Sequence, residues 1–380
     1  MLFKLTLFSL LISLNTIGQS EMSSFTLTGY AKGAKDSSII YLSSDFEDSN
    51  YYKFQSNSCV IIKEKFYFTG KVRGPLGVKF FYQYKDYGIQ SSTVFIEKGK
   101  LNTRFSIDAL RDNIVPIEGS ITQQRFQKSF MDIFTKNRFL RDNWYVEINK
   151  KYHNYKGEKL DSAISEMRIK YRKLQNNYLD EISEYAIKNS NSIIPIFLML
   201  DNFNGYEEKF VNALRYSSSK IKHSTLYQYV YKKMMDSKSL SIDEKFPILN
   251  LVNLHNNKLE SLSTYSNKKF IFIDFWFAKC GACVRQFPDF RKIVKSQNDT
   301  TFFNLISITI DPEKEINNAI NIIAEQKASW VQLWDKDGKN TFALNISSFP
   351  TNFLLDCTGK ILAKNIEPLE LNRFLRTYHK

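Results

Sequence analysis

Cysteine is scarce in this chain. The 380 residues include four cysteines, Cys59, Cys280, Cys283 and Cys357. Small scaffolds that are held together by disulfides carry cysteines at a much higher density. The chain is also long enough for two or three domains, and 43% of its residues are apolar, which is enough to build hydrophobic cores. A disulfide-stapled scaffold is therefore excluded.

Histidine is equally rare and is not clustered. The four histidines are His153, His223, His255 and His379. A tetrahedral zinc site usually takes its four ligands from two closely spaced pairs. Cys280 and Cys283 form one such pair, but Cys59 and Cys357 stand alone in the sequence. The spacing favours redox chemistry at the pair over half of a zinc site, and we expect no metal or other cofactor.

Long runs of basic residues are absent as well. The net charge of +14 would attract nucleic acid or membranes if it were concentrated in one segment. No five consecutive residues are basic, so the charge is interpreted as a lysine-rich surface spread over the whole molecule. We expect no nucleic-acid partner.

Apolar runs are short, and the one near the N-terminus is typical of an export signal. Residues 5–17 are mostly apolar, Lys4 precedes them, and the small residues Gly18 and Ser20 follow. A transmembrane helix needs about 20 residues, which is more than this run offers. The sequence predicts a signal peptide over residues 1–20 and an exported, periplasmic protein that is soluble after cleavage. No cysteine lies near the cleavage region to carry a lipid anchor.

Residues 24–118 have the pattern of a β-rich domain. Short apolar runs recur there, and Gly, Asp, Ser and Asn lie between them. The predicted strands cover residues 25–30, 39–42, 65–72, 78–81, 93–96 and 103–107. This spacing predicts an antiparallel β-sandwich or small barrel.

Residues 119–238 change to a helical period. Apolar residues follow one another in steps of three and four in two segments, residues 126–134 and 160–185. The longer segment has two interpretations, a coiled-coil dimer seam or a long helix that packs inside its own domain. Further helices predicted over residues 194–201, 206–215 and 226–235 would supply partners within the chain, which favours the second interpretation.

Residues 245–380 alternate between strands and helices in the order βαβαββα. The run 270–277 is almost continuously apolar, as in a central strand that is covered on both faces. The other predicted elements are a helix over 283–295, a strand over 303–310, a helix over 316–326, strands over 351–355 and 361–363, and a helix over 369–378.

The motif Cys280-Gly281-Ala282-Cys283 lies between the central strand and the helix that follows it. The unpaired N–H groups and the positive dipole end of a helix favour the thiolate form of a cysteine at that position. A second cysteine one turn later can attack a mixed disulfide and release it. The sequence therefore predicts that Cys280 is the attacking thiol and Cys283 the resolving thiol.

Asp274 is a carboxylate within the apolar strand, on the same face as Phe272 and Trp276. An isolated buried carboxylate is costly, and its pKa tends to be raised. Two interpretations are open. Asp274 either exchanges protons with the site or is a structural carboxylate, held by a hydrogen bond or partly exposed at the end of the sheet.

Taken together, these features resemble a known family. Residues 245–380 resemble the exported TlpA/ResA-like thiol–disulfide oxidoreductases, which have a thioredoxin fold. The resemblance rests on strand 272–276, the Cys280–Cys283 motif, Pro288, the inserted strand and helix after Phe303, Phe349-Pro350-Thr351 and residues 356–360. Residues 24–118 resemble a β-domain of unknown function that is often fused ahead of such modules. The expected fold is thus multidomain, with a β-sandwich, a helical region and a C-terminal α/β thioredoxin fold.

The resemblance also implies roles for residues around the motif. Asp274 would take the proton of the buried cysteine, Pro350 would follow a cis peptide bond, and Phe349 would line the substrate groove. Trp276 and Lys279 are further candidates for contact with substrate. Lys279 stands where the family usually has Trp, and it is either a cation that favours the Cys280 thiolate or simply a solvated lysine.

Five other positions carry weaker expectations. Asp311 and Glu313 follow the inserted strand, where some relatives place an acidic residue near the site. Ala282 replaces the family's common Pro, so a reduction potential cannot be transferred from relatives. Cys59 and Cys357 are interpreted as lone free thiols rather than further redox thiols, and a bridge between the two stays open.

The resemblance implies a periplasmic enzyme that reduces disulfides of client proteins without a cofactor. A membrane-bound thiol reductant would be its partner, because the compartment is kept oxidising. The alternative is a binding or scaffold protein in which the thioredoxin-like module is an accessory. A thiol peroxidase is disfavoured, because Ile273 and Phe277 stand where such enzymes carry Pro and Thr.

Overall fold

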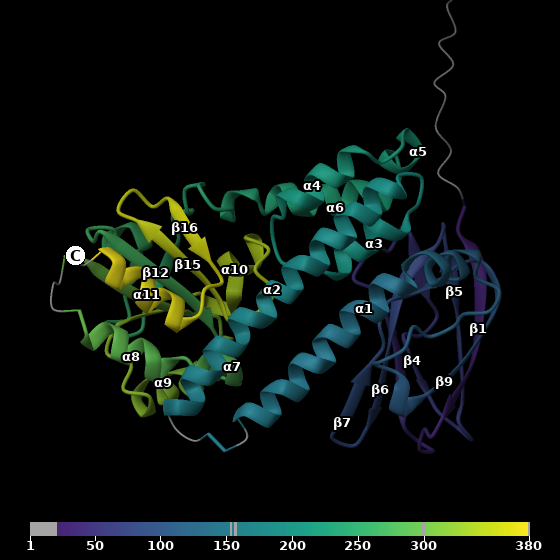
Figure 1. The fold of residues 1–380 in the computed structure, drawn as a ribbon, viewed down its shortest axis with the longest axis horizontal. Helices are drawn as coiled ribbons and strands as arrows, with labels where there is room; N and C mark the ends of the chain where they lie inside the picture. Colours follow the sequence, from purple (N-terminus) through teal and green to yellow (C-terminus); the bar gives the residue numbers. More distant parts are fainter. Residues whose placement is uncertain (1–20, 153, 156–157, 298–300, 379–380) are drawn as a thin grey trace, which may run out of the picture. The chain divides into compact units, whose positions relative to one another are not determined.

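The structure is a computed structural model that describes residues 21–152, 154–155, 158–297 and 301–378. The predicted signal peptide lies outside the described residues. The chain separates into two compact units, one ending at Gln124 and one starting at Arg125 (Figure 1). The helical region and the thioredoxin-like region thus belong to one unit, and a boundary between them near residues 238–245 stays a prediction.

The first unit consists of two β-sheets. Its strands are β1 (Ser23–Lys32), β2 (Ile39–Ser43), β3 (Tyr52–Phe54), β4 (Ser58–Val60), β5 (Lys65–Val72), β6 (Leu76–Tyr84), β7 (Tyr87–Gln90), β8 (Val94–Ile96) and β9 (Gly99–Ser106). One sheet has the order β3-β5-β1-β9. The other has the order β4-β2-β6-β7, and β8 also pairs with β6. Each predicted segment overlaps one of these strands.

The purely antiparallel sandwich predicted from the sequence needs one correction. Strands β1 and β9 pair in parallel, from Phe25 opposite Gly99 to Lys32 opposite Ser106. The chain passes through the second sheet between these two strands, so β9 returns to the first sheet in the direction of β1. The two sheets share an aromatic core, in which the ring of Phe80 on β6 lies 5.8 Å from that of Phe66 and 5.4 Å from that of Phe105.

The second unit begins with helices. They are α1 (Ile121–Tyr152, whose first residues belong to the first unit), α2 (Glu158–Lys188), α3 (Ile194–Asp201), α4 (Glu208–Arg215), α5 (Ser219–Lys222) and α6 (Thr225–Asp236). Helix α2 packs against α3 and α4 of the same chain, and the ring of Tyr185 lies 5.1 Å from that of Phe130 on α1. These contacts support the intramolecular interpretation of the long helix.

The rest of the second unit is a seven-stranded sheet with helices. Its strands are β10 (Asn250–Asn253), β11 (Leu259–Ser261), β12 (Phe270–Trp276), β13 (Phe303–Thr309), β14 (Val331–Trp334), β15 (Thr351–Asp356) and β16 (Ile361–Lys364), in the order β11-β10-β14-β13-β12-β15-β16. Its helices are α7 (Gly281–Val284), α8 (Phe287–Lys295), α9 (Ile316–Glu325), α10 (Lys339–Ala343) and α11 (Pro368–Tyr378). Short 3-10 turns cover Ile107–Ala109, Lys238–Leu240, Leu262–Tyr265, Glu313–Glu315 and Lys336–Gly338.

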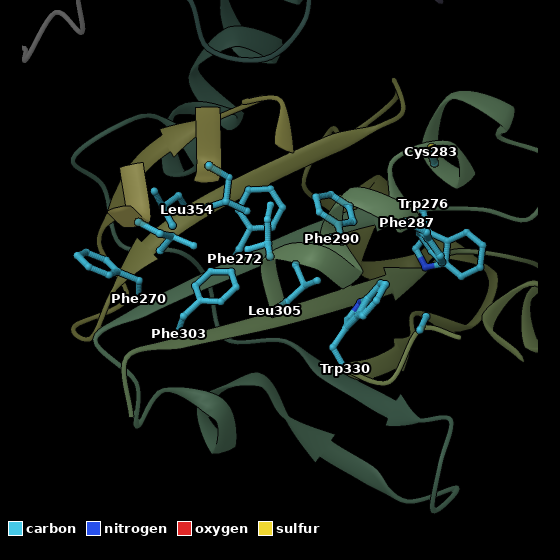
Figure 2. Close-up of a cluster of buried hydrophobic side chains, with 14 of the residues drawn as sticks. Phe270, Phe272, Trp276, Cys283, Phe287, Phe290, Phe303, Leu305, Trp330 and Leu354 are labelled. Atoms are coloured by element: carbon cyan, nitrogen blue, oxygen red, sulfur yellow. The ribbon is translucent and has the colours of Figure 1, made fainter. Parts of the chain in front are cut away.

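Strand β12 lies at the centre of this sheet and is buried along its whole length. Phe272 and Trp276 join one hydrophobic cluster, together with Cys283 and residues of α8 (Figure 2). Ile273 and Phe275 join a second cluster. The alternation of side chains along a strand explains this division, because successive residues point to opposite faces. The continuous apolar run was therefore correctly interpreted as a strand covered on both faces.

Two features of this region differ from the sequence prediction. The predicted order lacked β10, β11 and β14, each of which has only three or four residues and so gives a weak periodic signal. The helix predicted over residues 283–295 is divided into α7 and α8. Pro288 lies in the first turn of α8, where it has no N–H to donate and its ring conflicts with a carbonyl one turn earlier.

Candidate functional site

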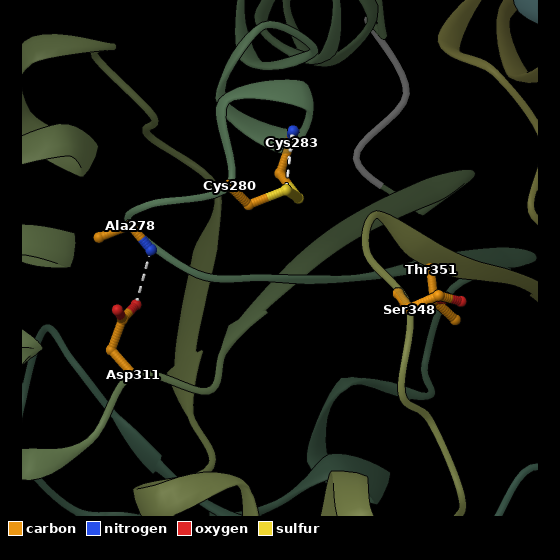
Figure 3. The surroundings of a disulfide bond; sticks show 6 residues. All are labelled: Ala278, Cys280, Cys283, Asp311, Ser348 and Thr351. Atoms are coloured by element: carbon orange, nitrogen blue, oxygen red, sulfur yellow. Dashed lines mark hydrogen bonds between the residues drawn. A yellow bond between two sulfur atoms is a disulfide. The ribbon is translucent and has the colours of Figure 1, made fainter. Parts of the chain in front are cut away.

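The two cysteines of the motif are joined by a disulfide at the start of α7, with an S–S distance of 1.99 Å (Figure 3). Cys280 is the N-cap residue, and its Sγ accepts a hydrogen bond from the Cys283 N–H at 3.2 Å. Cys280 is 7% exposed, whereas Cys283 is completely buried. Of the two sulfurs, that of Cys280 is thus the one nearer to solvent and to a helix N–H.

Asp274 is completely buried on β12, and neither of its carboxyl oxygens has a hydrogen-bond partner among the described residues. Burial raises the pKa of the Asp274 carboxyl well above its ordinary value. A carboxylate held by a structural hydrogen bond, or exposed at the sheet end, does not match these observations. The alternation on β12 places Asp274 on the face of Phe272 and Trp276, which is also the face of the cysteines.

Polar residues on the neighbouring strands lie opposite Asp274. The register pairs it with Ser307 on β13 and Asn352 on β15, and it pairs Ser307 with Gln332 on β14. The Ser307 Oγ accepts a hydrogen bond from Trp330 Nε1 at 2.9 Å, and the Asn352 side chain bonds the backbone of Ile366. Asp274 is therefore the ionisable member of a polar row that crosses an otherwise apolar face.

The peptide bond between Phe349 and Pro350 is cis, as the resemblance implies. The Phe349 ring packs edge-on against that of Phe277, with 5.5 Å between the ring centroids. The Thr351 Oγ1 donates a hydrogen bond to the Ser348 carbonyl at 2.7 Å. Figure 3 shows Ser348 and Thr351, which flank this bond, in the surroundings of the disulfide.

Trp276 does not lie at the surface, where a residue that contacts substrate would have to lie. Its side chain is completely buried, and its ring packs against that of Phe287 at 4.9 Å. The expected contact of Trp276 with substrate is therefore not supported. The indole instead packs in the core beneath α8 (Figure 2).

Lys279 is directed to solvent and is paired. Its side chain is 70% exposed, and its Nζ lies 2.8 Å from a carboxyl oxygen of Glu315. The hydrogen bond from Lys279 lowers the pKa of Glu315. The lysine charge next to Cys280 is thus balanced by a carboxylate, which weakens its expected effect on the thiolate.

Asp311 supports the loop that precedes the motif, although the sequence marked it only weakly. It is buried, and its Oδ2 accepts a hydrogen bond from the Ala278 N–H at 2.9 Å (Figure 3). The same oxygen accepts one from the Thr309 hydroxyl at 2.5 Å. Its backbone carbonyl accepts one from Trp334 Nε1. Glu313 lies on the surface instead, where it pairs with Lys336 at 2.7 Å.

Two polar residues next to the motif were missed by the sequence analysis. Gln286 is buried, and its Nε2 donates a hydrogen bond to Glu367 Oε2 at 3.1 Å. Burial raises the pKa of Glu367, although the neighbouring Arg168 opposes this shift. The available signal was that Cys283, Gln286, Phe287 and Phe290 have the spacing of one buried helix face, on which a glutamine needs a partner.

The remaining features concern the unpaired cysteines, metals and membranes. Cys59 and Cys357 are free thiols, as expected. Within the described part of the chain, no group of three or more His, Cys, Asp or Glu is arranged to hold a metal ion. Among the same residues, no helix combines the length and the apolar character needed to cross a membrane.

Comparison with known proteins places this geometry in a family. Residues 241–375 match the Redoxin family, and residues 25–126 match a domain of unknown function, DUF4369. The thiol–disulfide oxidoreductase ResA of Bacillus cereus is 22% identical over 138 residues, which are 36% of this chain and 75% of the relative. These matches support a TlpA/ResA-like thiol–disulfide oxidoreductase in residues 241–375, the C-terminal part of the chain. The protein is thus an enzyme with a thioredoxin-like fold in its C-terminal part.

Solved structures similar to this oxidoreductase cover the same region. The thioredoxin domain of a thiol–disulfide oxidoreductase from Bacteroides vulgatus is 25% identical, with a TM-score of 0.34, and the match covers 37% of this chain and all of that domain. A thiol:disulfide interchange protein from Bacteroides sp. is 26% identical, with a TM-score of 0.33, and the match covers 37% of this chain and 91% of that protein.

Proposed function

We propose that this oxidoreductase is exported to the periplasm, where it reduces disulfides of client proteins through Cys280 and Cys283. The observation that carries the proposal is the different burial of the two cysteines, on the sheet face that also carries a carboxyl group without a hydrogen-bond partner among the described residues. Cys280 keeps 7% of its surface exposed, whereas Cys283 and Asp274 are completely buried. The client disulfide must be reached by Cys280, whereas Cys283 attacks Cys280 from within the protein. The difference in burial suits these two steps.

In the reduced enzyme the Cys280 thiolate attacks one sulfur of a client disulfide. A bond forms between Cys280 and that sulfur, the client S–S bond breaks, and the second client sulfur leaves as a thiolate and takes up a proton. Cys283 then loses its proton and attacks the Sγ of Cys280, which releases the first client sulfur. The client gains two electrons, and the enzyme is left with the Cys280–Cys283 disulfide.

Asp274 is the proposed acceptor of the Cys283 proton. Because burial raises its pKa well above the ordinary value, the carboxyl can hold a proton that an exposed aspartate would release to water. Phe349 and Pro350 are proposed to border the client-binding groove, and Lys279 its rim. Trp276 keeps only a supporting role, because its side chain is buried.

The two sulfurs carry the electrons, so the proposed reaction needs no cofactor. An oxidising compartment does not reduce the enzyme again, so a membrane-bound thiol reductant is the proposed electron source. The predicted signal peptide supports export, and the resemblance to the TlpA/ResA-like oxidoreductases is the ground for proposing reduction rather than formation of client disulfides. We propose no nucleic-acid partner on the basis of the positive net charge.

Reduction of insulin disulfides by the full-length enzyme tests this proposal, with dithiothreitol as the electron source. We expect turnover by the wild type and none above background by Cys280→Ser. Cys357→Ser is the matched control, because Cys357 is an exposed free thiol outside the motif, and it should keep full turnover. Equal, negligible turnover by wild type and Cys280→Ser would refute the proposed reaction and support the scaffold alternative.

The reduction potential decides the direction of the reaction. Equilibration of the Cys280–Cys283 pair with glutathione, followed by alkylation, should give a value near about −270 mV or lower for a reductant. A value near about −120 mV would identify an oxidant and contradict the proposed direction.

A further inference from the structure

Two arginines of α2 contact the start of α11. Arg168 Nη1 lies 3.3 Å from Glu367 Oε2, and Arg172 Nη2 lies 2.8 Å from Glu370 Oε2. The two pairs differ in burial. The Glu367 side chain is only 11% exposed, whereas that of Glu370 is 28% exposed. An ion pair in the less exposed position has more influence on its surroundings, because water screens it less.

The contact of Arg168 continues to the redox motif. The oxygen that Arg168 contacts also accepts the hydrogen bond from Gln286 Nε2. The Gln286 backbone N–H in turn donates to the Cys283 carbonyl at 2.9 Å. Hydrogen bonds and an ion pair thus link α2 to the buried cysteine through Glu367 and Gln286.

Arg168 also affects the charge of Glu367. Burial raises the pKa of that carboxyl, and the nearby arginine charge is the first of the influences that lower it. The ionised carboxylate is the stronger acceptor for the Gln286 amide. Without Arg168, a protonated Glu367 would gain an O–H that can donate to the amide oxygen instead.

The other end of the Gln286 amide has no partner in this structure. Its Oε1 is buried and makes no hydrogen bond with any described residue. Cys283 precedes it by three residues, and Arg285 and Gln286 have helical backbone angles, so the two side chains are neighbours on one face. The disulfide sulfur of Cys283 carries no hydrogen, whereas reduction creates an S–H donor at this position.

We propose that Arg168 is a positioning residue of the redox site, which acts through Glu367 on Gln286. It keeps the amide NH2 of Gln286 on Glu367 and leaves the amide oxygen to accept the Cys283 thiol hydrogen in the reduced enzyme. This hydrogen bond exists only in the reduced form, so it favours the dithiol over the disulfide. The inference rests on the proposed redox role of Cys280 and Cys283.

The reaction that reports on this bond is the exchange with glutathione. Two glutathione thiols lose two electrons and two protons and form glutathione disulfide. The Cys280–Cys283 bond breaks, and each sulfur receives one electron and one proton. The proton stays on the Cys283 sulfur, and the resulting S–H donates a hydrogen bond to the Gln286 amide oxygen.

The experiment measures this equilibrium for the full-length chain as wild type, Arg168→Met and Arg172→Met. Arg172→Met is the comparison variant, because it removes an arginine of the same helix and its ion pair to Glu370 but leaves the contacts of Glu367 with Arg168 and Gln286 in place. The Arg172 charge also lowers the pKa of Glu367, but less than that of Arg168 does. A neutral hydrogen bond contributes about 1 kcal/mol, so Arg168→Met should shift the equilibrium about 2- to 10-fold toward the disulfide. A tenfold shift corresponds to a potential about 30 mV more negative. Arg172→Met should shift the potential clearly less than Arg168→Met, because Arg172 makes no ion pair with Glu367 and its charge affects that carboxyl less.

Further variants separate positioning from a loss of folding. Gln286→Met removes the amide but keeps both arginine pairs, and it should shift the potential in the same direction as Arg168→Met. Arg168→Lys keeps the positive charge and should restore at least half of the shift. Thermal unfolding is measured in parallel, because a purely structural role would lower the melting temperature of both arginine variants without moving the potential.

The outcomes separate this inference from the proposed function. Equal shifts in Arg168→Met and Arg172→Met, no shift in Gln286→Met, or a shift toward the dithiol would each overturn the positioning role. Wild-type protein that fails to reduce insulin would instead contradict the proposed function. A selective shift in Arg168→Met would still support the link to the cysteine pair in that case.

Discussion

At the scale of single residues, the site depends on groups whose chemistry is set by burial. Cys280 and Cys283 are the same residue type, yet Cys280 is 7% exposed and Cys283 is completely buried. Asp274 is completely buried and has no hydrogen-bond partner among the residues that the structure describes, and burial raises its pKa. The roles proposed for Cys280, Cys283 and Asp274 follow from their burial.

Asp274 predicts a pH dependence of stability. Because its pKa is higher in the folded than in the unfolded state, the folded protein binds more protons between the two values. Its unfolded-state pKa is about 3.9, so the free energy of unfolding should fall as the pH rises above that value. Urea denaturation of wild type and Asp274→Asn from pH 4 to pH 8 measures this. The part of the slope that Asp274 causes should be absent from the variant, and identical slopes would contradict the prediction.

Cys283 predicts a trapped intermediate. In Cys283→Ser the resolving sulfur is missing, so Cys280 should remain joined to its client as a mixed disulfide. Non-reducing gel electrophoresis after incubation with insulin, followed by mass spectrometry, should find insulin chains attached to Cys280. The double variant Cys280→Ser/Cys283→Ser is the control and should trap nothing. Attachment at another cysteine would argue against Cys280 as the attacking thiol.

At the scale of secondary-structure elements, the site is held by contacts between segments that are distant in the sequence. Asp311, which follows β13, fixes the loop that joins β12 to α7 through the Ala278 N–H. Pro288 separates α7 from α8, so the cysteines lie on a short helix of their own. The position of the motif therefore depends on its neighbours as much as on its own helix.

Asp311→Ala should destabilise this part of the enzyme. The variant leaves the part-buried Ala278 N–H without its acceptor, which costs about 1 kcal/mol, the lower end of the range for a fully buried group. Glu313→Ala changes an exposed acidic residue two positions later and should stay within about 0.5 kcal/mol of the wild type. Chemical denaturation of both variants checks this, and equal stabilities would show that the Asp311 contact contributes nothing.

In the β-rich unit, a residue of β1 packs closely against a residue of β5. Gly29 lies opposite Phe66, and a Cβ at Gly29 would lie 1.9 Å from the Phe66 ring. Gly29→Ala should therefore displace this core ring, at a cost of about 1–3 kcal/mol. Thr28→Ala, next to it on the exposed face of β1, is the control and should have a much smaller effect. Thermal unfolding compares the two, and an unchanged melting temperature in Gly29→Ala would refute the prediction.

At the scale of the whole molecule, the described chain consists of two compact units. The cysteines, Asp274, the cis-proline segment and the helix α2 that contacts α11 all belong to the unit that starts at Arg125. The helical region therefore belongs to the redox unit rather than only joining it to the β-rich unit.

A fragment of residues 125–380 should fold and keep the disulfide exchange of the full chain. It retains every described partner of the site, whereas a fragment of residues 241–380 lacks Arg168 and the packing of α2. Circular dichroism and glutathione equilibration of both fragments measure this. The longer fragment should have the wild-type potential. A folded longer fragment with an altered potential would show that the β-rich unit acts on the site.

The sequence by itself determined the local features of this protein. The cysteine spacing, the apolar run of β12 and the periods of most strands and helices follow from neighbouring residues. Local patterns carry this information because side-chain direction repeats along each element. Together with the resemblance to a known family, they were sufficient to predict a thioredoxin-like module, the redox pair and Asp274.

Only the tertiary structure decided which distant residues meet. The burial of Trp276 and the parallel pairing of β1 with β9 depend on how the strands are arranged in the sheets, and so does the lack of a hydrogen-bond partner for Asp274 within the described chain. The contacts from Arg168 to Glu367 and from Glu367 to Gln286 join three segments of the chain that only folding brings together. The periodic pattern of residues within one helix or strand does not indicate such contacts, because they arise from packing between elements.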